Sequence, residues 1–184
     1  MRHLTGRHHR AATTLATVAL AALTLAACGG DDGDKSGGPA PTFEAGTTMA
    51  RLAEADKITV GTKFDQPLFG LKGPDGKPVG FDVEIAKIIA GALGIDDDKI
   101  TWVETVSANR EPFIQNGQVD IVVATYTIND ERKQKISFAG PYYIAGQQLM
   151  VRSDNTDITG PESLAGKTVC SVEGSTPAKN ILEN

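Results

Sequence analysis

Short apolar runs along the chain predict the strands of a buried parallel sheet. Three of them cover 58–62, 99–104 and 120–125, and two more are expected over 147–152 and 168–172. In the third run Ile121 to Ala124 are all apolar. An unbroken apolar run is typical of a strand covered on both faces, because a half-exposed strand would alternate apolar and polar residues.

Between these runs the apolar positions recur with the period of a helix. A helix is predicted over 81–93, ended by Gly94, and a shorter one over 109–116, ended by Gly117. To the core face of the longer helix we assign Phe81, Ile85, Ile88, Ile89, Ala92 and Leu93. Strands and helices alternate, and right-handed crossovers would make the first three strands parallel. The sequence therefore predicts an α/β fold.

Local signals predict smaller elements around this frame. A short helix over 49–55 precedes the first strand, and Pro74 to Gly76 form a turn between two short extended pieces. A turn with a short helix is expected over 160–166. Thr176 as the cap and Pro177 as the first helical residue would open another helix.

Polar residues that suit a carboxylate follow the third strand directly. Thr125 and Thr127 stand at its end, and Asn129 can cap a short helix that leaves Arg132 close to both hydroxyls. Ligands bind at the carboxyl ends of the strands in such sheets. A guanidinium fork with hydroxyl donors is suited to a carboxylate. The alternative is a surface arginine paired with an acidic neighbour on its own helix.

Three further residues are candidates for the same pocket, and each has an alternative role. Asp65 and Gln66 follow the first strand, where they either line the pocket or turn the chain. Arg110 either binds an acidic ligand side chain, which would explain acidic specificity, or caps a helix or pairs with Glu104 or Glu111.

The start of the chain is typical of a secreted protein. A basic segment followed by the apolar run over 11–27 indicates a signal peptide. The sequence LAAC that ends at Cys28 resembles the lipobox of bacterial lipoproteins, so residues 1–27 would be removed and Cys28 lipidated. An uncleaved membrane anchor is the alternative. Residues 28–48 are rich in Gly, Pro and Asp and would form a disordered tether.

Composition then excludes several function classes. Loss of the signal peptide would leave 15 Lys and Arg against 23 Asp and Glu, a formal charge of −8, which argues against nucleic acid as a partner. All three histidines lie in that segment, so the mature chain would have no histidine-based triad or His-ligated metal site. We expect neither a metal nor a cofactor. Cys170 would be left single, and in an oxidising compartment it would need a partner.

Four stretches, taken together and in order, carry a family resemblance. They are GTKFDQP at 61–67, GFDVEIAKIIAGALG at 80–94, NREPFIQNGQVDIVVATYTINDERKQKISFAGPYY at 109–143 and LAGKTVCSVEGSTPAKN at 164–180. With them the chain resembles the bacterial extracellular solute-binding proteins of family 3, the receptors of polar amino-acid ABC transporters. The glutamate-binding branch is the most similar. The resemblance covers about 58–184.

The resemblance implies a fold of the periplasmic-binding-protein type II, in which two α/β lobes close over one amino acid. By position, Arg132 would bind the α-carboxylate, while Thr125 supplies a backbone carbonyl and Thr127 a hydroxyl. From lobe 2 the loop Gly174, Ser175 and Thr176 would add donors. The lobe 2 acidic residue that takes the α-amino group would lie beyond Asn184, as would a disulfide partner for the remaining cysteine.

The same resemblance implies the domain boundaries. Lobe 1 is expected over 49–145, and the hinge and the start of lobe 2 over 146–184, so that lobe 2 would be only begun and the chain truncated. We assign Tyr142 and Tyr143 to the approach to the hinge. The protein is expected to be a monomer.

Our leading hypothesis is a non-enzymatic, lipid-anchored protein on the extracytoplasmic face of the bacterial cell membrane. It would capture glutamate or a related polar amino acid and deliver it to an ABC transporter permease. One alternative is an enzyme that resembles cyclohexadienyl dehydratases, with a buried carboxylate as general acid. Another is a lipoprotein that senses a ligand and reports to a different membrane partner.

Overall fold

The computed structural model describes residues 41–183. The predicted signal peptide, Cys28 and residues 29–40 of the predicted tether lie outside the described residues. Phe43 already packs against the core, and Thr47 caps helix α1 (Thr48–Ala55) by accepting a hydrogen bond from Ala50 N at 3.2 Å. Described structure thus begins within the stretch that we expected to be tether.

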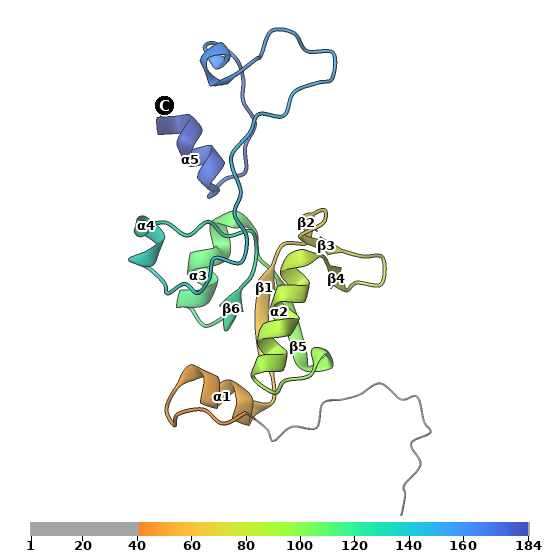
Figure 1. The fold of residues 1–184 in the computed structure, drawn as a ribbon, viewed down its shortest axis with the longest axis vertical. Coiled ribbons are helices and arrows are strands. Elements are labelled where there is room, and N and C mark those ends of the chain that lie inside the picture. Colours follow the sequence, from red (N-terminus) through yellow and green to blue (C-terminus); the bar gives the residue numbers. More distant parts are fainter. Residues whose placement is uncertain (1–40, 184) are drawn as a thin grey trace, which may run out of the picture. The chain divides into compact units, whose positions relative to one another are not determined.

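Three parallel strands form the main sheet (Figure 1). β1 (Ile58–Thr62) lies between β5 (Ile100–Glu104) and β6 (Ile121–Val122), and its Val60 is opposite both Trp102 and Ile121. The parallel arrangement predicted for these three runs is confirmed. β6 is shorter than the predicted strand over 120–125 because the backbone turns into the left-handed region at Thr125, where φ is 44°.

Helix α2 (Phe81–Ala92) packs on β1 through a narrow face. That face includes Ala86 and Ala90, which are fully buried in the core, and Ile85 packs against them. The assignment to the core was wrong for four residues that are exposed, namely Phe81, Ile88, Ile89 and Ala92. Helix α2 has apolar residues on more than one face, and the two alanines allow the closest approach to the sheet.

A small antiparallel sheet follows β1 in the chain. It consists of β2 (Asp65–Gln66), β3 (Gly70–Lys72) and β4 (Pro78–Val79), in the order β2-β3-β4. The predicted turn at Pro74 to Gly76 connects β3 and β4, and Gly76 supplies the positive φ of 80° that the turn needs. This sheet places Asp65 and Gln66 beside the end of β1.

Short helices complete the first part of the fold. They are η1 (Asp97–Lys99), η2 (Ser107–Asn109), α3 (Arg110–Gln115) and α4 (Asp130–Lys133). The predicted cap of α4 is confirmed, because Asn129 Oδ1 accepts a hydrogen bond from Arg132 N at 2.9 Å. This cap sets the start of α4 and thereby the direction in which the arginine side chain leaves it.

From Gly140 onward the described chain contains only short helices, η3 (Pro161–Leu164) and α5 (Thr176–Glu183). The strands predicted over 147–152 and 168–172 are absent from this segment, because no other described strand pairs with them. Met150 and Val172, at 99% and 53% exposure, are therefore left outside any core. Helix α5 begins at Thr176, and its cap is Ser175, whose hydroxyl accepts from Ala178 N at 3.1 Å. None of the helices within 41–183 is long and apolar enough to cross a membrane.

Candidate ligand-binding site

A cavity of about 430 Å³ lies where β1 and β6 end. Most of the residues predicted for the site line it, namely Asp65, Gln66, Arg110, Thr125, Thr127, Ser175 and Thr176. Lys63, Ser107, Ser171, Val172 and Pro177 complete the lining. The remaining predicted residues, Arg132 and Gly174, contact each other beside it. The structure therefore brings together residues that stand more than a hundred positions apart in the sequence.

Thr125 connects the two sheets at the cavity. Its hydroxyl donates a hydrogen bond to Gln66 Oε1 at 2.9 Å, which joins the end of β6 to β2. Its main chain N–H donates to Asp82 Oδ2 at 2.7 Å. These two bonds hold a β-branched residue at a φ of 44°, a conformation that such residues rarely adopt. The carbonyl and hydroxyl groups of Thr125 thus have a set direction.

Arg132 is buried and its donors are directed toward the predicted loop. Nη1 donates to Thr127 O at 2.9 Å and to Thr176 Oγ1 at 3.2 Å, and Nη2 donates to Gly174 O at 3.0 Å. Nε lies 3.2 Å from Glu111 Oε1 in an ion pair. The arginine therefore pairs with an acidic residue from α3, while the acidic residues of its own helix, α4, pair with lysines.

Arg110 is still more deeply buried, at 3% exposure. Its guanidinium donates to the main-chain carbonyls of Ser107, Ala124 and Thr125 at 3.1 to 3.4 Å. A fourth hydrogen bond runs from Nη2 to Gly174 O at 3.2 Å. Burial, together with the nearby charge of Arg132, lowers the pKa of Arg110 to about 10. These four hydrogen bonds go to main-chain carbonyls, so neither alternative pairing, with Glu104 or with Glu111, is what holds this side chain.

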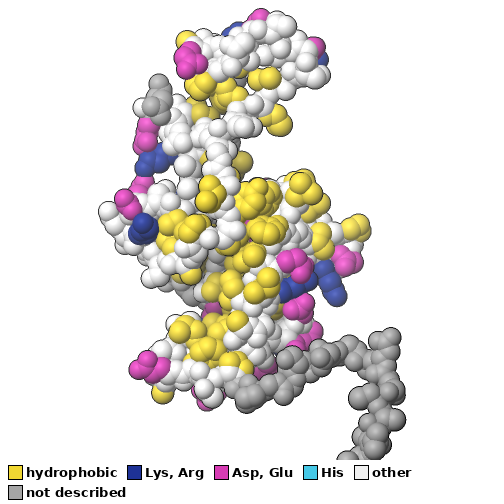
Figure 2. Space-filling view, viewed as in Figure 1, with side chains coloured by type: hydrophobic (Ala, Val, Ile, Leu, Met, Phe, Trp, Pro, Cys, Tyr) yellow, Lys and Arg dark blue, Asp and Glu magenta, His cyan; other side chains and the backbone are white. Residues whose placement is uncertain are grey.

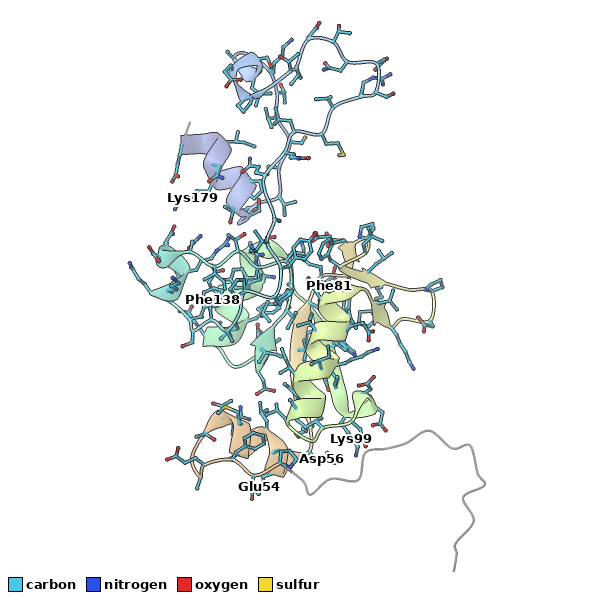
Figure 3. All side chains as sticks on the ribbon, in the orientation of Figure 1. Glu54, Asp56, Phe81, Lys99, Phe138 and Lys179 are labelled. Atoms are coloured by element: carbon cyan, nitrogen blue, oxygen red, sulfur yellow. The ribbon has the colours of Figure 1, made fainter. Side chains whose placement is uncertain are left out.

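The two guanidinium groups are brought together by an aromatic ring. Cζ of Arg110 lies 4.2 Å from the centroid of the Tyr126 ring, and Cζ of Arg132 lies 4.8 Å from it. Phe138, labelled in Figure 3, packs edge-on against the same ring at 5.1 Å. Burial raises the pKa of Tyr126, as does the neighbouring Glu111 carboxylate, so the phenol stays neutral. A neutral ring face stabilises two adjacent cations that would otherwise repel each other.

Both arginines converge on one acceptor, the carbonyl oxygen of Gly174. That residue has a φ of +72°, and a Cβ added to it would lie 2.7 Å from Ala108 Cα. Only glycine allows the loop to approach so closely, because a side chain would overlap the backbone of η2. Farther along the same segment, Lys179 of α5, which is labelled in Figure 3, forms an ion pair with Glu131 of α4.

Two residues at the site were missed by sequence reasoning. Lys63 lines the cavity, is only 5% exposed, and lies 3.4 Å from Asp65 Oδ1. Asp82 is fully buried and holds the backbone of Thr125. The available signal for Lys63 was its place directly after a buried strand. For Asp82 it was an aspartate in the first turn of an apolar helix. Neither signal alone separates a site residue from a surface one.

The arrangement gathers donors for a negatively charged group. Among the residues from 41 to 183, no group of histidine, cysteine, aspartate and glutamate side chains could hold a metal ion. Cationic and hydroxyl donors line the cavity from several elements, and one N–H of each of the two guanidinium groups donates to the same oxygen. Charged donors of this kind also bind carboxylates.

Comparison with known proteins identifies relatives of the whole described domain. The bacterial extracellular solute-binding proteins of family 3 match the chain over residues 58–181. The glutamate-binding protein GluB of Corynebacterium efficiens is 40% identical over 178 residues, which are 94% of this chain and 56% of that protein. The ABC transporter glutamine-binding protein GlnH of Bacillus subtilis is 42% identical over 173 residues, covering 92% of this chain and 62% of that one.

A solved structure has the same fold. An ancestral arginine-binding protein bound to glutamine is 37% identical and superimposes with a TM-score of 0.65, covering 70% of this chain and 56% of the other. The likeness supports the predicted α/β fold of the periplasmic-binding-protein type. The chain spans a little over half the length of this structure and of GluB.

Proposed function

The chain belongs to the bacterial extracellular solute-binding proteins of family 3, and from this premise we propose that it binds L-glutamate or a closely related polar amino acid for import. The relatives named above are amino-acid-binding proteins, and one of them is by its name part of an ABC transporter. Delivery to a permease would then follow binding. The proposal depends on the residues around the cavity, argued below.

The observation that carries the proposal is the convergence of Arg110 and Arg132 on one oxygen. In this structure that oxygen is the carbonyl of Gly174. A ligand carboxylate carries a full negative charge where the carbonyl carries only a partial one, so it would bind these donors more strongly. The α-carboxylate of an amino acid would take this place, with the hydroxyls of Thr127 and Thr176 beside it.

The rest of the cavity suits the other groups of a glutamate-like ligand. Its volume, about 430 Å³, lies within the range of small-molecule sites. The carboxylate of Asp65 and the carbonyl of Thr125 are acceptors for an α-ammonium group. Lys63 and the amide of Gln66 are donors for a polar or acidic side chain. Lys63 is only 5% exposed and lies 3.4 Å from Asp65 Oδ1, so an acidic ligand side chain would share this cation with Asp65.

Transport would follow from closure of the two lobes over the ligand. A ligand that contacts both lobes stabilises the closed state by its differential affinity, and a permease can recognise that state. Lipidation of Cys28 would keep the protein at the extracytoplasmic face of the membrane, close to its permease. These steps belong to the proposal.

Isothermal titration calorimetry tests the binding step. The protein, expressed from its native coding sequence, should bind L-glutamate or L-glutamine with one site per chain. Arg132→Met should weaken this binding at least a hundredfold, because a bidentate charged contact to the ligand is lost. Arg51→Met is the matched control, since Arg51 is an exposed arginine that pairs with Asp120 far from the cavity. Absence of binding to any polar amino acid would refute the proposal.

The same preparation tests the enzymatic alternative. Incubation with arogenate or prephenate, followed by chromatography of the products, would detect a dehydratase. We expect no turnover, because the cavity directs donors to a carboxylate and offers no evident proton donor at a leaving group.

A further inference from the structure

Asp82 is a buried carboxylate that contacts the site without lining the cavity. It lies in the first turn of α2 and has no exposed surface. Oδ2 accepts the N–H of Thr125 at 2.7 Å, and Oδ1 accepts the hydroxyl of Tyr142 at 2.8 Å. One carboxyl group therefore connects a cavity residue with a residue 17 positions later in the chain. A buried charge is costly unless both oxygens are bonded, as they are here.

The hydrogen bond between Asp82 and Thr125 affects groups that would contact a ligand. With φ at 44°, Thr125 is held in a conformation that persists only where its surroundings impose it. The bond from its N–H to Asp82 is the shortest that Thr125 makes. A change of φ at Thr125 would turn its carbonyl and its side chain relative to the amide that Asp82 holds. Asp82 thus helps to fix the orientation of two polar groups at the cavity.

The Tyr142 end lies in a part of the chain that has no helix or strand. The ring of Tyr142 is 6.0 Å from Phe81, and Tyr143 packs at 5.4 Å against Phe69. Figure 3 labels Phe81 at the start of α2. In Figure 2, which has the same orientation, hydrophobic side chains gather over this end of the helix. From here the chain continues into the segment that carries Gly174 and Thr176. Tyr142 thus stands at the start of the segment that leads to that side of the cavity.

The two hydrogen bonds also favour the charged form of the carboxyl group. Burial is the larger influence and raises the pKa of Asp82, although the bonds from Tyr142 and Thr125 lower it. Loss of the tyrosine hydroxyl removes one of the two donors, and the carboxyl group then either rotates or takes up a proton. Both responses weaken its hold on the Thr125 amide.

We propose that Asp82 is a positioning residue that couples the chain segment at Tyr142 to the orientation of Thr125, and hence to ligand affinity. The inference rests on the proposed amino-acid binding. A shift of the segment that leads away from Tyr142 would reorient a binding group inside the cavity without touching the ligand.

The experiment measures L-glutamate and L-glutamine binding by calorimetry in the native protein and in Tyr142→Phe. The hydroxyl lies outside the cavity, yet its removal should weaken binding about tenfold, or about 1.4 kcal/mol. Tyr143→Phe is the matched control, because it removes a neighbouring hydroxyl and keeps the same ring packing; it should leave affinity within about twofold. In an Asp82→Asn background, Tyr142→Phe should have less than half of its effect, because the charged acceptor is gone.

An NMR measurement follows the coupling without relying on affinity. In 15N-labelled protein, the Thr125 amide proton should move upfield in Asp82→Asn, and its exchange with solvent should quicken in Tyr142→Phe but not in Tyr143→Phe. A general loss of stability would not single out this amide.

The possible outcomes separate the two proposals. If the unaltered protein binds neither amino acid, the proposed function fails, and this inference fails with it. If it binds and Tyr142→Phe changes neither affinity nor the Thr125 amide, the coupling is refuted while the function stands. An equal effect of Tyr142→Phe with and without the Asp82 carboxylate would also refute it. If Asp82→Asn fails to fold, the coupling is still tested by the affinities and Thr125 amide exchange of Tyr142→Phe and Tyr143→Phe.

Discussion

Replacement of Gly174 by alanine tests whether close approach of its loop builds the site. Gly174 and Gly166 both have a φ of +72°, so an alanine at either position has the same intrinsic strain. They differ in surroundings, because a Cβ at Gly174 would lie 2.7 Å from Ala108 Cα and 2.9 Å from its N, whereas a Cβ at Gly166 meets nothing within 4 Å. Gly166→Ala is therefore a control matched in backbone conformation.

The expected magnitude follows from what the loop carries into the site. The shared strain costs about 1–2 kcal/mol in each variant. Because the atoms opposite Gly174 belong to the backbone, the loop itself has to move, and Ser175 and Thr176 then move away from the cavity that they line. A hydrogen bond from the loop to a charged ligand contributes about 1.5–3 kcal/mol, and water replaces part of it. We expect a net loss of about 2 kcal/mol in ligand binding, roughly thirtyfold in Kd.

Calorimetric titration with L-glutamate measures the difference, and urea unfolding of both variants checks the shared strain. Gly174→Ala should bind roughly thirtyfold more weakly than the unaltered protein, and Gly166→Ala within about threefold. Equal affinities in the two variants would refute the view that this loop forms a wall of the site. Tighter binding by Gly174→Ala would show instead that release of the arginines from the Gly174 carbonyl outweighs the displacement of the loop.

Three further predictions concern charge and anchoring. Arg132→Lys keeps the charge but loses the fork, so calorimetry should show glutamate binding weakened at least tenfold. Because burial raises the pKa of Asp82 above 3.8, its contribution to stability is present at lower pH and is lost as pH rises through the raised value. Unfolding free energies of Asp82→Asn and the unaltered protein, measured in urea from about pH 3.5 to 7, should therefore differ progressively in favour of the variant. Cys28→Ser should release the protein from the cell membrane into the medium, as a blot of the fractions would show; retention at the membrane would contradict the lipid anchor.

Much of the fold from α1 to α4 could be predicted, because its elements are set by residues close together in the sequence. The strand over 58–62 has the predicted bounds, and Gly94, Gly117 and Asn129 mark helix ends through backbone and capping preferences that act within a few residues. Thr125, Thr127, Asp65 and Gln66 could also be named, because they follow strands whose carboxyl ends meet at one edge, whereas the loop Gly174 to Thr176 came from the family resemblance. Their roles in binding stay predictions.

Predictions failed where an element depends on a distant partner. The runs over 147–152 and 168–172 have strand composition, but a strand exists only if another pairs with it, and none in the described chain does. The apolar pattern of α2 fits more than one buried face, and contact with β1 selects the face of Ala86 and Ala90. The cap of α5 moved by one residue, from Thr176 to Ser175, because both side chains are able to cap.

The sequence by itself determined the α/β frame, the family and the set of polar residues at one edge of the sheet. Only the tertiary structure decided how those residues are paired. Arg132 reaches Gly174 across 42 positions, Arg110 reaches it across 64, and Asp82 reaches Tyr142 across 60. Local preferences act over a few residues, whereas these bonds are set by burial, which leaves each charged group only the partners that the packed chain brings to it.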